Sequence, residues 1–149
     1  MKFFKNATET EKIIKSLNSN NGIYLVPAFT GLGAPYWKPD ARGTLVGITR
    51  DTERDHVIRA TLESIAYQSS DLLNAMQKDG VKPLIVKVEG GMVQNNWLMQ
   101  FISDVLNLPI YRPKVHETTA LGAALIAGYG IGIYKSCLLY TSDAADDQA

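Results

Sequence analysis

Hydrophobic side chains recur along the first fifty residues at spacings that predict one helix followed by two strands. Residues 9–17 carry apolar side chains at helical spacing and are followed by a run of Asn, Ser and Gly, which ends a helix. Residues 23–29 and 44–48 are compact apolar runs bounded by turn residues, as is typical of buried strands. A Gly- and Pro-rich loop joins these two predicted strands.

The longest periodic segment predicts a helix that ends at Gly80 and Pro83. Thr52 followed by Asp55 resembles a capping box at its start, with Asp in the place of the usual Glu or Gln. The apolar positions of this helix form one stripe that faces a core: Ile58, Leu62, Ile65, Ala66, Leu73 and Met76.

The second half of the chain repeats the alternation of strand and helix. Residues 84–88 predict a buried strand, a helix follows from Asn95, and residues 109–112 predict a brief strand. An alanine-rich helix then runs through Ala127, with Thr118 or Thr119 as its cap. This order predicts an α/β domain with a mainly parallel sheet covered by helices.

Composition narrows the range of functions. The chain has 149 residues, 46% of them hydrophobic and 20% charged, as expected for one soluble globular domain. Fifteen basic and fifteen acidic residues cancel without a long run of one sign, so nucleic acid and anionic membranes are not expected partners. No apolar run approaches the ~20 residues of a membrane span, and the start of the chain is polar, so we expect a cytoplasmic protein.

Metal chemistry has little support in the sequence. Cys137 is the single cysteine, which excludes an internal disulfide and a Cys-based zinc cluster, and His56 and His116 lack ligand-like spacing. We therefore predict no metal site. Both histidines are interpreted as surface or packing residues, and no grouping of side chains predicts a catalytic residue.

The turn after the third predicted strand is the main candidate binding site. Gly90 and Gly91 lie at the mouth of a helix, where glycine lets the backbone approach a flat ligand. Asn95 offers an amide with a donor and an acceptor, which suits the edge of an adenine. The alternative stays open that the glycines only make a tight turn and that Asn95 only caps its own helix.

Two further segments are candidate binding sites. In the loop, Gly31 and Gly33 lack the third glycine of a dinucleotide fingerprint, and no Walker-type motif occurs in the chain. Tyr36 and Trp37 could stack on a ligand, but we interpret the loop as structural. Residues 117–128 place small Ala and Gly residues along one face of the predicted helix, so another backbone could pass close to it. This fits a helix at a crossing between domains and a tightly buried core helix equally well.

These segments together resemble one family. Three of them match the C-terminal signature of FGGY carbohydrate kinases at each defined position: residues 43–48, 56–57 and 60–63. Two others, residues 27–37 and 119–124, resemble the glycerol kinases within that family. The similarity covers roughly residues 21–136, with a weaker tail toward Met1.

The resemblance implies a partial actin-like ATPase (ribonuclease H-like) fold, with ATP and substrate in a cleft between two domains. This chain would supply the C-terminal nucleotide-binding domain, incomplete at both ends. Gly91 and Asn95 map onto family nucleotide contacts, with Gly90 beside them. Glu89 departs from the usual aspartate and keeps its charge.

The resemblance also implies what this chain lacks. The catalytic aspartate, the glycerol contacts and most contacts to phosphate and Mg²⁺ belong to the N-terminal portion of such kinases. The parent protein is therefore expected to be a homo-oligomeric ATP:glycerol 3-phosphotransferase, and this chain alone is expected to be inactive and poorly soluble. The alternatives are another FGGY sugar or polyol kinase, or a non-catalytic actin-like nucleotide-binding module.

The end of the chain does not fit the rest. Residues 137–149 resemble translated adapter DNA, so we predict a domain over residues 1–136 followed by a non-native tail. A genuine tail of small residues is the alternative.

Overall fold

The computed structural model describes residues 7–112 and 118–133, and its contacts divide the chain into two units. The first comprises residues 1–86 and 94–110, and the second comprises residues 87–93 and 111–149. The predicted tail, Cys137 and His116 lie outside the described residues. No helix in the described ranges is long and apolar enough to cross a bilayer.

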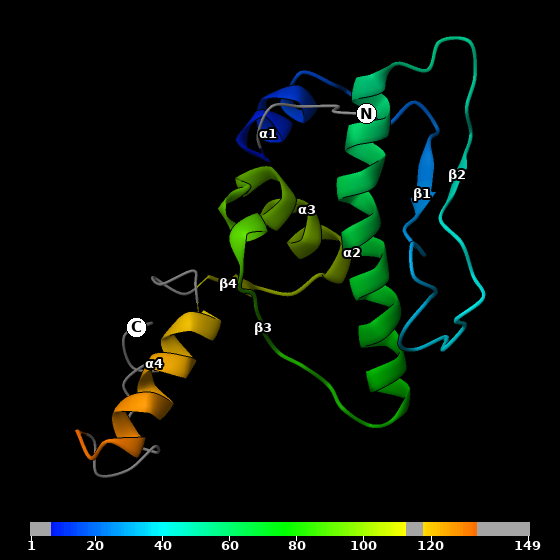
Figure 1. Cartoon of the computed structure of the whole chain (residues 1–149). Coiled ribbons are helices and arrows are strands. Elements are labelled where there is room, and N and C mark those ends of the chain that lie inside the picture. Colours follow the sequence, from blue (N-terminus) through cyan, green and yellow to red (C-terminus); the bar gives the residue numbers. More distant parts are fainter. Residues whose placement is uncertain (1–6, 113–117, 134–149) are drawn as a thin grey trace. The chain divides into compact units, whose positions relative to one another are not determined.

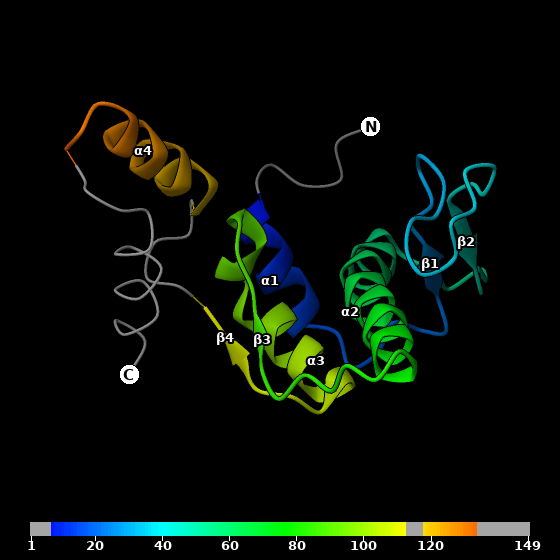
Figure 2. The ribbon, with the colours of Figure 1, turned by 90° about the horizontal axis from the view of Figure 1, so that it is seen from below.

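Three helices form the core of the first unit: α1 (Ala7–Lys15), α2 (Arg54–Lys78) and α3 (Asn96–Leu106). Each packs against the other two, and Figure 2 shows α1 and α3 side by side. Their buried apolar side chains are Ile14, Ile58, Ala60, Leu62, Ala66, Leu98, Met99 and Ile102. The three helices predicted from periodicity in this part of the chain are confirmed, with ends shifted by a few residues.

Two short strands lie beside α2 in the first unit (Figure 1). β1 (Tyr24–Val26) pairs antiparallel with β2 (Thr44–Val46), and Leu25 lies opposite Leu45. β1 contacts α2, where the rings of Tyr24 and Tyr67 lie 6.2 Å apart. The turn that follows β2 requires glycine at position 47. A Cβ on Gly47 would overlap the carbonyl oxygen of Gly22.

The predicted capping box of α2 was wrong by one residue. The N-cap is Glu53, whose backbone N–H donates to Nδ1 of His56 at 3.0 Å. The Thr52 hydroxyl accepts instead from the backbone N–H of Thr49 at 2.8 Å, within the preceding turn. Asp55 forms an ion pair with its neighbour Arg54, so neither predicted partner caps the helix. His56 therefore takes part in the cap of α2.

A buried ion pair joins α2 to the segments around it. Arg59 and Glu63 lie one helical turn apart with Nε and Oε1 at 2.8 Å, and their side chains are only 14% and 4% exposed. The second oxygen of Glu63 accepts from the Asn20 amide at 2.8 Å, and Arg59 also donates to the carbonyl of Leu17 and lies 5.3 Å from the ring centre of Trp97. These contacts fix the turn between α1 and β1 onto α2 and α3.

The same carboxylate affects a neighbouring tyrosine. Burial raises the pKa of Tyr67, and the negative charge of Glu63 raises it further. Tyr67 also contacts the edge of Phe101, whose ring stacks on Trp97. The cluster of charges and rings therefore continues from α2 to α3.

The predicted mainly parallel sheet is not present as one layer among the described residues. β3 (Val86–Lys87) and β4 (Ile110–Tyr111) form a second, separate two-stranded sheet. Two of its backbone hydrogen bonds advance together along both strands, from Val86 N–H to Pro109 O and from Val88 N–H to Tyr111 O, as in parallel pairing. β1 and β2 are antiparallel because the chain turns back on itself between them. The α/β class is confirmed.

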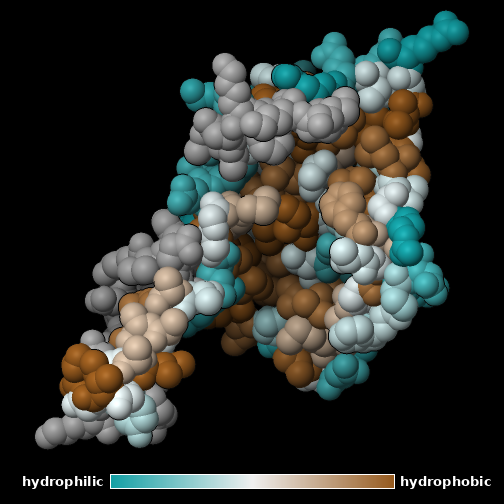
Figure 3. Space-filling view, in the orientation of Figure 1, coloured by the Kyte–Doolittle hydropathy of each residue, from teal (hydrophilic) through white to brown (hydrophobic). Residues whose placement is uncertain are grey.

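Large apolar side chains are exposed in the first unit, and Figure 3 shows hydrophobic surface gathered on the face that it displays. Phe29 is 72% exposed and Trp37 is 75% exposed. Contiguous uncovered apolar surface favours association and weakens cooperative packing. We therefore expect the 149-residue chain to bind a hydrophobic dye and to melt over a broad temperature range. A sharp cooperative transition at high temperature in a calorimeter would contradict this.

Candidate functional site

The double-glycine turn lies in the second unit, directly after β3. The 3₁₀ helix η1 (Gly91–Gln94) begins within it, and the Val93 N–H donates to the Gly90 carbonyl at 3.2 Å. Gly90 has a φ of 91°, a left-handed conformation that favours glycine. A Cβ built on either glycine would meet no atom within 4 Å among the described residues. The space above both glycines is therefore open.

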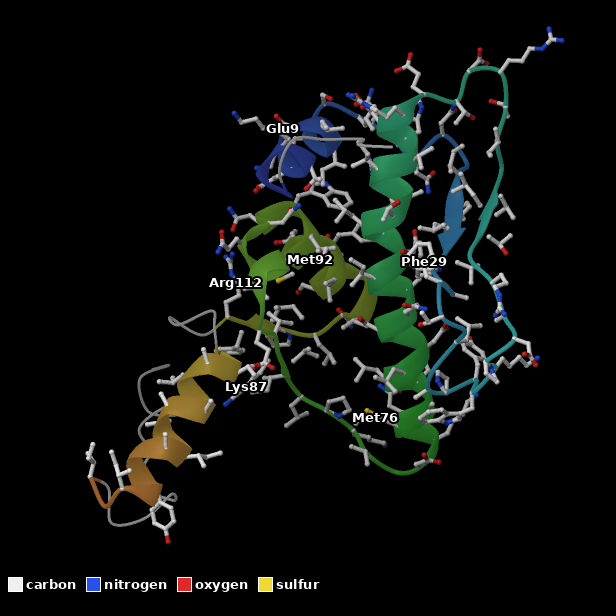
Figure 4. All side chains as sticks on the ribbon, viewed as in Figure 1. Glu9, Phe29, Met76, Lys87, Met92 and Arg112 are labelled. Atoms are coloured by element: carbon white, nitrogen blue, oxygen red, sulfur yellow. The ribbon has the colours of Figure 1, made fainter. Side chains whose placement is uncertain are left out.

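The turn is held from β4 as well as from β3. The Arg112 guanidinium donates to the carbonyl of Val93 at 3.1 Å, and Figure 4 shows Arg112 beside the turn, which contains Met92. The Val88 N–H donates to the Tyr111 carbonyl at 3.0 Å at its base. These contacts fix both ends of the turn within the second unit.

Asn95 lies in the first unit and caps α3. Its Oδ1 accepts from the Leu98 N–H at 2.9 Å, and its Nδ2 donates to Oγ1 of Thr10 on α1 at 3.4 Å. The cap that sequence analysis kept as an alternative is thus confirmed. The cap uses the amide oxygen, and the second N–H of the amide has no partner among the described residues.

A carboxylate from α1 lies at the start of the same helix. The hydrogen bond from Lys15, whose Nζ lies 2.7 Å from Oε1 of Glu11, is the main cause that lowers the pKa of Glu11. The backbone N–H groups of Asn96 and Trp97 lower it further, while burial opposes them. A negative charge at a helix N-terminus is favourable, and here the chain itself supplies it.

Three residues that contact the candidate residues were not predicted from the sequence: Thr10 and Glu11 in the first unit, and Arg112 in the second. Thr10 lies 85 residues before its partner Asn95, and Arg112 lies 19 residues after its partner Val93. No local pattern marks such pairs, because they depend on how helices and strands pack.

The other two candidate segments are the loop between β1 and β2 and the alanine-rich helix. In the loop, a hydrogen bond to Asp71 on α2 raises the pKa of Tyr36, so this ring is tied to its own domain, and Trp37 projects into solvent. The alanine-rich segment forms α4 (Thr118–Gly130), in which Ile126 is exposed. No group of three or more metal-ligating side chains gathers within the described part of the chain.

Comparison with known proteins identifies relatives for nearly the whole chain. Residues 4–131 match the model of the FGGY family of carbohydrate kinases, C-terminal domain. A glycerol kinase from Aeromonas salmonicida is 52% identical over 149 residues, which cover 99% of this chain and 29% of the relative. A glycerol kinase from Psychromonas ingrahamii is 56% identical over 137 residues, 91% of this chain and 27% of the relative.

A solved structure supports the same relationship. The crystal structure of Plasmodium falciparum glycerol kinase with ADP matches 95% of this chain with a TM-score of 0.75 and 38% sequence identity. The match covers 28% of that chain. This chain therefore spans less than a third of the length of these relatives.

Proposed function

The chain belongs to the FGGY family of carbohydrate kinases, as a C-terminal domain, and on this premise we propose that it is the nucleotide-binding part of an ATP-dependent glycerol kinase. The whole protein would transfer a phosphoryl group from ATP to glycerol, giving glycerol 3-phosphate. Support comes from the 52% and 56% identity to glycerol kinases and from the ADP in the Plasmodium falciparum structure.

The proposed nucleotide site consists of Gly90, Gly91 and Asn95. The observation that carries it is the open space above both glycines, where a side chain would meet no atom within 4 Å among the described residues. Backbone without a Cβ lets a flat base lie close, and the free N–H of Asn95 offers a donor to a ring nitrogen. The glycines can form a tight turn, and Asn95 can cap α3, while the same residues contact a nucleotide.

The finer features of the fold belong to the same proposal. In an actin-like ATPase fold, a mainly parallel sheet would be completed by segments outside this chain, and these would cover apolar side chains such as Phe29 and Trp37. The remaining part of the enzyme would supply the catalytic aspartate, the glycerol contacts and, with the phosphates of ATP, the ligands of Mg²⁺. A cytoplasmic location and a homo-oligomeric state are part of this expectation.

The direct test is a phosphorylation assay with the full-length protein that contains this chain. Positioning and charge stabilisation around the γ-phosphate are what accelerate phosphoryl transfer. We therefore expect turnover with ATP and glycerol, and no turnover by the 149-residue chain alone. Titration calorimetry with ADP measures the nucleotide site separately from the chemistry.

Other outcomes would identify the alternatives. Turnover with xylulose or another sugar in place of glycerol would show a different kinase of the same family. ADP binding without turnover on any polyol would show a non-catalytic nucleotide-binding module. Glycerol phosphorylation by the isolated chain would contradict the division of roles proposed here.

A further inference from the structure

The start of α3 is held by two consecutive residues of α1. Thr10 is buried, at 7% exposure, and its hydroxyl accepts from Nδ2 of Asn95 at 3.4 Å. Glu11 follows it on α1, paired with Lys15 and turned to the first backbone N–H groups of α3. The two helices are in contact along this region. One turn of α1 thus contacts both the side chain that caps α3 and the backbone that the cap serves.

Two hydrogen bonds leave the amide of Asn95 only one orientation. Its oxygen accepts from the Leu98 N–H and its nitrogen donates to the Thr10 hydroxyl. A rotation of the amide by half a turn would place its NH₂ against the Leu98 N–H, where two donors would face each other and the cap would be lost. The second N–H, which has no partner among the described residues, is therefore held in a fixed direction.

We propose that Thr10 and Glu11 are positioning residues for Asn95, which fix its free N–H as a hydrogen-bond donor toward the nucleotide. This inference rests on the function proposed above. Thr10 acts on the amide itself. Glu11 acts on the helix that carries it, because a negative charge near the N-terminus of α3 stabilises its first turn.

The proposal assigns Asn95 the role of donor and excludes the role of acceptor from the base. Its oxygen is committed to α3, so the partner on the purine must be an acceptor such as a ring nitrogen. Asn95→Asp separates the two roles of the side chain, because aspartate keeps the acceptor that caps the helix and removes the donor. We expect this variant to keep its melting temperature and to lose affinity for ADP.

Thr10→Val in the full-length protein tests the positioning role. Valine keeps the shape of threonine and removes the hydroxyl that accepts from Asn95, so we expect the KM for ATP and the Kd for ADP to rise about three- to tenfold. The value of kcat should stay constant, because the base is bound equally in the ground state and the transition state. Thr10→Ser restores the hydroxyl and should restore affinity.

A matched control and a second variant complete the experiment. Thr61→Val removes a hydroxyl that donates to the carbonyl of Val57 on the exposed side of α2, and it should leave KM and kcat unchanged. Glu11→Gln keeps the shape of the side chain and removes its charge, and it should raise the KM for ATP without lowering kcat.

A double-mutant cycle distinguishes positioning from a general loss of structure. In an Asn95→Ala background, Thr10→Val should cause no further loss of ADP affinity, because no amide remains to be positioned. If Asn95→Ala weakens ADP binding and Thr10→Val does not, the positioning role is wrong and the nucleotide site stands. If Asn95→Ala leaves ADP binding unchanged, both proposals fail.

Discussion

Gly91→Val is expected to weaken ADP binding at least about a hundredfold while the melting temperature of the full-length protein stays constant. The backbone of Gly91 lies outside the left-handed region, and a Cβ there would meet no described atom within 4 Å. The folded chain therefore accommodates the valine. The added methyl groups would occupy the space in which the purine is proposed to lie, and a flat ligand has no way to avoid them.

The neighbouring glycine does not provide an equally clean test. Gly90 has a φ of 91°, so any side chain there strains the backbone whether or not a ligand binds. Gly33→Val is the matched control, because this loop glycine also has open space around it. Calorimetric titration with ADP and a thermal melt of each variant are the measurements. Wild-type affinity in Gly91→Val would remove the glycine turn from the nucleotide site.

Glu63→Ala is expected to lower the free energy of unfolding by about 3–5 kcal/mol. The carboxylate of Glu63 is almost fully buried and bonds both Arg59 and Asn20 at 2.8 Å. Its removal leaves the Arg59 charge buried without its ion-pair partner and releases Asn20, which precedes β1. Chemical denaturation of the full-length protein measures this loss.

Two further comparisons test whether burial of the ion pair causes this loss of stability. Asp55→Ala removes a partner from the exposed pair with Arg54, and it should cost less than about 1 kcal/mol. The double variant Arg59→Met, Glu63→Leu replaces both charges with apolar groups and should be more stable than Glu63→Ala alone. Equal losses for Glu63→Ala and Asp55→Ala would contradict the buried-pair interpretation.

The helices could be predicted from the sequence because their signals are local. The stripe that includes Ile58 and Leu62 identified α2, and Asn95 marked the start of α3. The capping box failed because His56 supplied the acceptor that Asp55 was expected to supply. A histidine in that place lies outside the usual pattern of capping residues.

The pairing of strands and the surroundings of the site could not be predicted in the same way. The antiparallel partner of β1 follows a loop of about seventeen residues, and periodicity alone does not specify pairing. The sequence indicated Gly90, Gly91 and Asn95 as a candidate site but gave no sign of Thr10, which lies on another helix. Residues that act through packing leave no motif in the sequence.

The carboxylate of Glu11 at the start of α3 has a consequence for selectivity among nucleotides. The negative charge of Glu11 offsets part of the positive end of this helix dipole, which weakens its attraction for a phosphate. In the proposed enzyme, this segment would then recognise the base and be nearly indifferent to the length of the phosphate tail. Discrimination between ATP and its product ADP would fall to the other part of the protein.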